Sequence, residues 1–214
     1  MNKLLCILMI IGLFGFAFAD DAPNADSTKK EIMKEKSMDK AKTSANPLVV
    51  MTIAHGDTEL GKVTIEVYEK EVPIHAANFL KLVDEGYYNG LTFHRVVPNF
   101  VIQGGDPTGT GTGGPPGRLQ DDPSSPYTHE RGTIAMARSG EGASKSQFYI
   151  NLKQNFFLDK QGFLIFANVV DGMDVVDKIA TVETGPGDKP AVPVTMTKVE
   201  RKSANKQDEK AKSE

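Results

Sequence analysis

The stretch that decides the fold is Thr92 to Gly114, TFHRVVPNFVIQGGDPTGTGTGG. Its first half continues a pattern of short β-favouring runs, 91–97 and 99–103, separated by a proline-containing turn. Its second half is rich in glycine, which lets a chain turn with backbone angles that other residues resist. The stretch therefore predicts two strands and a tight loop, with the polar side chains Arg95 and Gln103 placed inside otherwise apolar strands.

The glycine loop contains a literal G-x-G-x-x-G at Gly109, Gly111 and Gly114, the spacing of a dinucleotide-binding turn. Such a turn needs a helix after it, because the helix N-terminus binds the pyrophosphate. The residues after Gly114 carry prolines and no helical apolar stripe, and Glu130, at roughly the spacing of a ribose-binding acid, precedes a strand instead of ending one. A nucleotide-binding oxidoreductase is therefore rejected, and the glycines are expected to serve a tight turn.

Outside this stretch the dominant pattern is alternation with a period of two. In GKVTIEVY the apolar residues Val63, Ile65 and Val67 alternate with polar ones, as in a strand with one buried face. Similar runs occur at 48–54, 132–138, 146–152, 163–170 and 192–200. About eight short strands in one domain predict a mainly β fold, either a closed barrel or a sandwich.

Two segments have helical spacing instead. Residues 73–85 begin with a proline suited to the first turn of a helix and end at Gly86, with apolar residues three or four positions apart. Residues 171–180 form a second, shorter helical pattern. Two separated helices among so many strands argue against repeated βαβ units and a parallel sheet.

The first nineteen residues have the pattern of a secretory signal peptide. Lys3 precedes an apolar run, and Ala17-Phe18-Ala19 forms a cleavage site before Asp20. The run of about fifteen residues is shorter than the ~20 that span a bilayer. We therefore expect an exported protein without a membrane span after cleavage; the periplasm is favoured, and release from the cell is the other outcome. Because Cys6 is the single cysteine, disulfides and cysteine metal sites are excluded from the mature chain.

Composition places one folded domain at 47–200. Residues 20–46 and 201–214 are charged and poor in apolar residues, as in a flexible linker and tail. The net charge of −3 gives no reason to expect nucleic-acid binding. The four histidines lack metal-ligand spacing, the glycine-containing stretch 139–146 is expected to be a surface turn, and nothing indicates more than a monomer.

The sequence allows two interpretations of the candidate site residues. Alternation places Phe93, Arg95 and Val97 on one face of a strand, and Gln147 with Tyr149 on one face of another. The plainer interpretation makes Arg95 a solvated charge, which is the commoner fate of arginine. It also assigns the aromatic and aliphatic residues to the barrel core: Phe100, Tyr149, Leu158 and Phe163. Composition by itself favours this interpretation.

Four motifs favour a functional role for these residues. TFHRVVPNFVIQGGDPTGTGTGG, GTIAMAR, SQFYINL and NFFLD resemble, in order and spacing, the motifs of the cyclophilin-type peptidyl-prolyl cis-trans isomerases, here of a bacterial, exported kind. The resemblance runs from about Leu48 to Glu200, effectively the whole domain. It implies a closed eight-stranded antiparallel β-barrel capped by two α-helices. It also implies an enzyme that accelerates X-Pro bond rotation and assists the folding of exported proteins.

By motif position the resemblance implies that Arg95 and Gln103 are catalytic. It assigns substrate binding to Phe100, Val101, Ala137, Arg138, Gln147, Tyr149, Phe157, Leu158 and Phe163. Three positions depart from the best-known eukaryotic pattern, since Phe157 replaces a tryptophan, Phe163 a histidine and Arg138 an asparagine. The first change argues against tight cyclosporin binding, and the other two are expected to alter peptide preference.

The chemistry that the resemblance implies is simple. Rotation about an X-Pro amide is opposed by roughly 18–20 kcal/mol of resonance, and in the twisted transition state the prolyl nitrogen gains a lone pair that a guanidinium can hydrogen-bond. No cofactor, metal or nucleophile is required, and the expected partners are proline-containing polypeptides. A peptide-binding chaperone module using the same groove with little isomerase activity is the alternative. Retention of Arg95, Phe100 and Gln103 together favours the enzyme.

Overall fold

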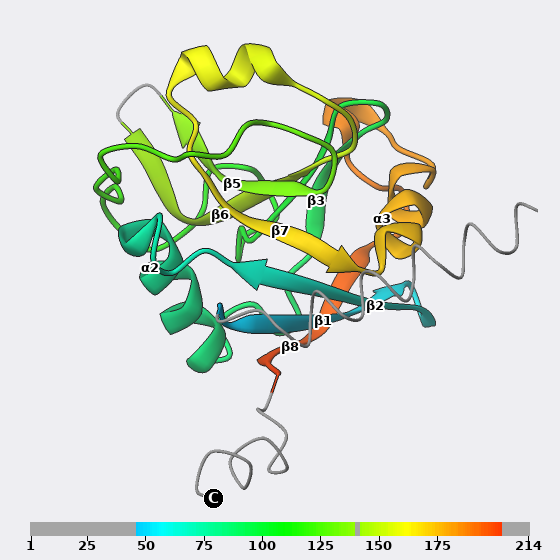
Figure 1. Ribbon diagram of the computed structural model, residues 1–214. Coiled ribbons are helices and arrows are strands. Elements are labelled where there is room, and N and C mark those ends of the chain that lie inside the picture. Colours follow the sequence, from blue (N-terminus) through cyan, green and yellow to red (C-terminus); the bar gives the residue numbers. More distant parts are fainter. Residues whose placement is uncertain (1–45, 140–141, 203–214) are drawn as a thin grey trace, which may run out of the picture.

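Eight strands form a single sheet in which every paired neighbour is antiparallel, in the order β3-β4-β6-β5-β7-β2-β1-β8 (Figure 1). The computed structural model describes residues 46–139 and 142–202. The expected signal peptide, nearly all of the expected linker and most of the expected tail lie outside these residues. The strands are β1 (Leu48–His55), β2 (Thr58–Val67), β3 (Phe93–Val97), β4 (Val101–Gly104), β5 (Thr133–Ser139), β6 (Gly142–Asn151), β7 (Ile165–Asp171) and β8 (Val194–Arg201).

The two ends of this sheet, β3 and β8, meet and nearly close it into a barrel. Thr92, just before β3, forms a bridge with Thr195 of β8. The backbone of Met196 accepts a hydrogen bond from Gly90 and donates one to Leu91, both at 2.8 Å. The predicted eight-stranded antiparallel barrel is therefore confirmed, and the sandwich that the strand pattern had left open is excluded.

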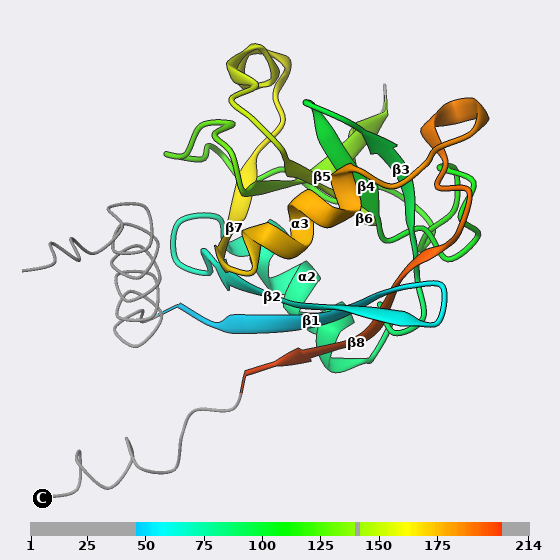
Figure 2. The same cartoon turned by 90° about the vertical axis from the view of Figure 1, so that its right-hand side faces the viewer.

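Helices α2 (Pro73–Asp84) and α3 (Met173–Ala180) lie at opposite ends of the barrel (Figures 1 and 2). Pro73 begins α2, where its missing N–H would have no helical partner anyway. The carboxylate of Asp122, far along the chain, accepts the next two backbone N–H groups, of Ile74 and His75. Short 3₁₀ helices η1 (Phe156–Gln161) and η2 (Pro186–Asp188) complete the fold. Among the described residues, no helix has the length and apolar character to cross a membrane.

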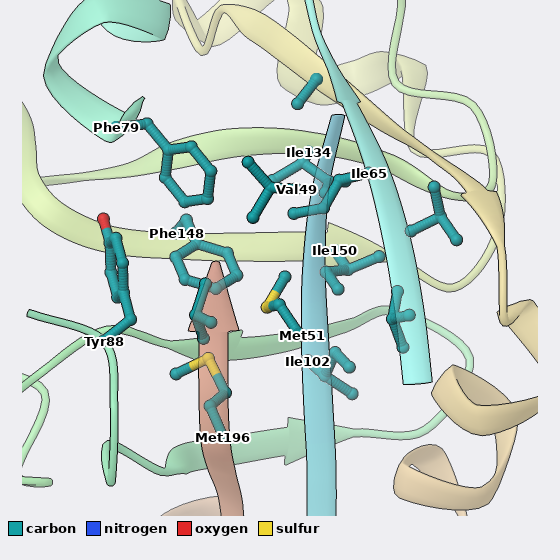
Figure 3. Packing of buried hydrophobic residues seen from close by; sticks show 14 of the residues in the cluster. Val49, Met51, Ile65, Phe79, Tyr88, Ile102, Ile134, Phe148, Ile150 and Met196 are labelled. Atoms are coloured by element: carbon teal, nitrogen blue, oxygen red, sulfur yellow. The ribbon is translucent and has the colours of Figure 1, made fainter. Parts of the chain in front are cut away.

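Two hydrophobic clusters lie on opposite faces of the same strands. The main core fills the barrel and includes Ile102, Ile134 and Phe148 (Figure 3). Their sequence neighbours Val101, Ala135 and Tyr149 belong to a second, smaller cluster. Because successive side chains of a strand point to opposite faces, this second cluster lies outside the barrel interior. Phe100, Tyr149, Leu158 and Phe163 all pack there, so the interpretation that made them barrel core is wrong.

Two local predictions were also wrong. In β3 the pairing shifts between Phe93, which faces Gly104, and Arg95, which faces Gln103. The extra residue of this bulge turns Phe93 into the main core, so Phe93 does not share a face with Arg95. The expected surface turn at 139–146 was too long, because β6 already begins at Gly142.

Candidate functional site

A cavity of about 220 Å³ opens beside the second cluster, and nine side chains line it. They come from β3, β4, β5, β6, η1 and the segments next to them, and all nine were predicted from the sequence: Arg95, Phe100, Val101, Gln103, Ala137, Arg138, Tyr149, Leu158 and Phe163. The sheet order explains this convergence, since β3, β4, β6 and β5 are consecutive neighbours. Residues more than sixty positions apart in the chain therefore share one pocket.

One side of the cavity is apolar and rigidly packed. Val101, Tyr149 and Leu158 are almost completely buried, so they present only part of their surface to the opening. The ring of Phe163 meets that of Tyr149 edge-on, with centroids 5.8 Å apart and an interplanar angle of 78°. Such walls favour a small apolar ligand group over water.

The other side is polar. Arg95 and Gln103 are direct partners in the β3–β4 pair. The Arg95 Nε atom lies 3.4 Å from Oδ2 of Asp188 in η2, and Asp188 has a positive φ of 60°. The amide nitrogen of Gln103 donates to Gln147 at 3.0 Å. A permanently charged guanidinium and an oriented amide thus adjoin an apolar pocket.

The two remaining predicted residues lie outside this cavity. Gln147 lines a neighbouring cavity of about 470 Å³, which shares Gln103, Ala137 and Arg138 with the first. Phe157 is 53% exposed, and its ring stacks on Phe100 with centroids 5.9 Å apart. Phe157 therefore extends the apolar surface at the rim without forming part of the pocket wall.

The glycine loop borders the larger cavity and closes around a buried carboxylate of its own chain. Asp106 accepts hydrogen bonds from the backbone N–H groups of Thr108, Gly111 and Gly113, and from the Thr108 hydroxyl, at 2.6–3.0 Å. Burial alone would raise the pKa of Asp106, but these hydrogen bonds outweigh it and lower the pKa to about 2. The N–H of Gly111, within the G-x-G-x-x-G, and those of Thr108 and Gly113 beside it are therefore engaged by Asp106 and are not free to bind a phosphate.

Comparison with known proteins decides what this arrangement is. Residues 50–201 match the sequence model of the family described as "Cyclophilin type peptidyl-prolyl cis-trans isomerase/CLD". The chain belongs to the cyclophilin family. It is accordingly a peptidyl-prolyl cis-trans isomerase, and the resemblance seen in its motifs is confirmed.

The alignments with this cyclophilin span most of the length of each relative. It is 41% identical to peptidyl-prolyl cis-trans isomerase ppi1 of Schizosaccharomyces pombe over 66% of this chain and 93% of the relative. It is 40% identical to a peptidyl-prolyl cis-trans isomerase of Acinetobacter baylyi over 72% of this chain and 87% of the relative. A crystal structure of a Cryptosporidium parvum cyclophilin, 29% identical, matches with a TM-score of 0.68 over 75% of this chain and 99% of that one.

One residue beside the cavity of this cyclophilin was missed in the sequence. His129 is buried behind Tyr149 and is hydrogen-bonded to it. Its partners Tyr149 and Asp159 lie 20 and 30 positions away, so no local spacing could have revealed the cluster. Among the described residues, no group of three or more His, Cys, Asp or Glu side chains is placed to hold a metal ion.

Proposed function

We propose that this cyclophilin binds proline-containing segments of polypeptides with the proline ring in the 220 Å³ cavity, and that Arg95 and Gln103 promote rotation of the X-Pro bond. The observation that carries the proposal is the joining of a small apolar pocket to a guanidinium on its rim. A related Cryptosporidium parvum cyclophilin, 29% identical with a TM-score of 0.65, has been crystallised in the presence of the dipeptide Ala-Pro. This supports a proline-sized ligand for the corresponding pocket.

The roles proposed for Arg95, Gln103 and the apolar wall follow from the chemistry of the amide. Twisting the X-Pro bond removes its resonance and leaves a lone pair on the prolyl nitrogen. The guanidinium of Arg95 donates to that lone pair, an interaction that is weak in the planar ground state and therefore lowers the barrier. Gln103 hydrogen-bonds the peptide flanking the proline, while the apolar wall keeps the ring from turning with the rest.

An isomerisation assay on an X-Pro peptide tests the role of Arg95. Arg95→Ala should lower kcat/KM by about 10- to 100-fold, the effect of losing a charged hydrogen bond of about 1.5–3 kcal/mol. A matched control is Arg201→Ala, because Arg201 pairs with Asp84 on α2 and is likewise part-exposed. The control should keep the wild-type rate.

Two outcomes would contradict the proposal. If the wild-type protein isomerises the peptide no faster than buffer does, the chain lacks the proposed activity. Full activity in Arg95→Ala would leave the family intact but would assign the transition-state interaction to another group.

We further propose that the enzyme acts on exported proteins outside the cytoplasm, in the periplasm or after release from the cell. The support is the sequence pattern of residues 1–19, with a lysine, an apolar run and a small-residue cleavage site before Asp20. Mass spectrometry of the protein from its native host should find Asp20 as the first residue. Finding Met1 or Asn2 at the N-terminus would contradict export by this route.

A further inference from the structure

His129 is buried and contacts two residues that line the cavity, Tyr149 and Phe163. The side chain of His129 is fully buried, with Nε2 at 2.7 Å from the Tyr149 hydroxyl and Nδ1 at 2.5 Å from Oδ1 of Asp159. The imidazole ring lies nearly parallel to the Tyr149 ring and edge-on to that of Phe163. Both of those aromatic residues line the cavity.

The backbone of His129 is tied to the same region. Its N–H donates to Asp159 at 3.1 Å, and its carbonyl accepts from the N–H of Asn155 at 2.7 Å. Asn155 immediately precedes η1, and Asp159 follows the cavity residue Leu158 within η1. His129 therefore connects η1, which supplies Leu158, to β6, which supplies Tyr149.

We propose that His129 is a positioning residue of this isomerase, which acts through Tyr149 and Asp159 to hold the apolar wall of the cavity in its binding geometry. The inference rests on the proposed function, in that it takes the cavity to be the proline-binding site. His129 does not line the cavity, so its effect on the reaction passes through the residues that do.

The protonation state of His129 determines both hydrogen bonds. The Asp159 carboxylate can only accept, so Nδ1 carries a proton, and in a neutral ring Nε2 then accepts from the Tyr149 hydroxyl. Burial lowers the pKa of His129, and the opposing effect of Asp159 does not overcome it. At neutral pH the ring is therefore uncharged, and Tyr149 is held with its hydroxyl directed to the histidine.

Acid should disturb this arrangement. Below the pKa of His129, Nε2 becomes a donor and the buried Tyr149 hydroxyl loses its acceptor. The charged and titratable groups that bear on the pair are Asp159 on η1 and Arg138 on β5, whose charge acts on Tyr149. We expect KM for the peptide to rise as His129 is protonated, with a smaller change in kcat.

The test compares two amide variants in the isomerisation assay. His129→Asn has no atom at the Nε2 position and should raise KM about tenfold, corresponding to one lost hydrogen bond. In His129→Gln the longer amide side chain can still accept a hydrogen bond from Tyr149. The increase in log KM should therefore be at most half of that in His129→Asn. His129→Gln should also remove the rise of KM at acidic pH, since an amide does not titrate. Thermal unfolding of each variant checks that it is folded under the assay conditions.

A double-mutant cycle separates positioning from a general effect on folding. If His129 acts through the Tyr149 hydroxyl, then His129→Asn should change KM by less than threefold in a Tyr149→Phe background. Full additivity, or a wild-type KM in folded His129→Asn, would overturn the inference. If His129→Asn does not fold, NMR titration of the wild-type imidazole replaces it: a KM that stays constant through that titration also overturns the inference.

The Arg95→Ala assay keeps this result distinct from that of the proposed function. If Arg95→Ala retains full activity, the proposed catalytic site itself is wrong. If Arg95→Ala loses activity while His129→Asn keeps the wild-type KM, only the positioning role of His129 fails.

Discussion

Gly104 and Gly105, at the end of β4, differ in whether the backbone leaves room for a Cβ atom. Gly105 has a φ of +85°, and a Cβ added to it would lie 2.2 Å from the backbone carbonyl oxygen of Ser146 in β6. Gly104 has no such backbone angle, and its nearest obstacle, the carbonyl oxygen of Thr92, would be 3.1 Å away. Of the two glycines, Gly105 is therefore the one that no other residue can replace.

Gly105→Ala should destabilise the protein by more than about 3 kcal/mol, because a left-handed conformation costs roughly 1–2 kcal/mol and the clash with β6 adds to it. Gly90→Ala is the matched control, since Gly90 has a φ of +80° with nothing within 4 Å of an added Cβ. It should show the conformational penalty alone. Urea unfolding measures both variants, and equal losses of stability would refute the role of the contact with Ser146.

At the residue scale the proposed catalytic arginine also depends on local backbone geometry. The bulge in β3 buries Phe93 and leaves Arg95 opposite Gln103. The ion pair with Asp188 joins two half-exposed groups at 3.4 Å, so it adds little to stability. Its effect is on the direction of the guanidinium, next to a cavity that Arg95 itself lines.

At the scale of elements, the loop of residues 105–114 is organised by one carboxylate. Asp106 is buried and engages three backbone N–H groups of a loop that has no regular secondary structure. Two carbonyls of the same loop, of Gly111 and Gly113, accept hydrogen bonds from Gln147. Because Gln147 also accepts from Gln103, the loop is linked to the proposed catalytic amide.

The pKa of Asp106 makes this loop sensitive to acid. Its pKa is about 2 in the folded protein against 3.8 for the unperturbed group. Because the folded-state pKa is depressed, the stabilisation is complete above pH ~4 and is lost as the pH falls toward 2, a change of about 2 kcal/mol.

Urea unfolding of the wild type and Asp106→Asn from pH 5 to pH 2 measures this effect. Asparagine keeps one acceptor oxygen but no titratable charge. The difference in stability between the two proteins should therefore shrink as the pH falls, whereas a difference that stays constant would contradict the assignment.

At the scale of the whole molecule, the two ends of the domain are secured to each other. The first and last strands, β1 and β8, are neighbours in the sheet. The N–H of Lys202 donates to the carbonyl of Leu48, and that of Val67 donates to the carbonyl of Pro47. β8 itself ends at Arg201, slightly beyond the expected domain limit at Glu200.

A protein restricted to residues 46–202 should consequently retain the fold and the isomerase rate. All strands and both helices named above lie within this range. We expect its Tm to lie within about 4 °C of that of the protein beginning at Asp20, a difference of less than roughly 1 kcal/mol for a domain of this size. Calorimetry and the peptide assay measure this, and a larger loss of Tm would show that the charged segments contribute to the folded state.

Much of this structure follows from local patterns in the sequence. Alternating apolar residues placed the strands, and helical spacing placed α2 and α3, because each pattern reports which side of an element is buried. The motif around Arg95 and Phe100 identified the family, and nine of the residues assigned from the resemblance line one cavity. Periodicity could not separate a barrel from a sandwich, since both need strands with one buried face.

What only the tertiary structure decided are the contacts between segments far apart in the chain. The bridge between Thr92 and Thr195 brings the two ends of the sheet together, the bulge in β3 separates Phe93 from Arg95, and His129 is hydrogen-bonded to Tyr149 and Asp159 beside the cavity. None of these has a local signal, because each depends on which strands become neighbours. The sequence by itself therefore determined the strands, the two α-helices, the family and the nine residues that line the cavity. Packing alone decided how those residues are held.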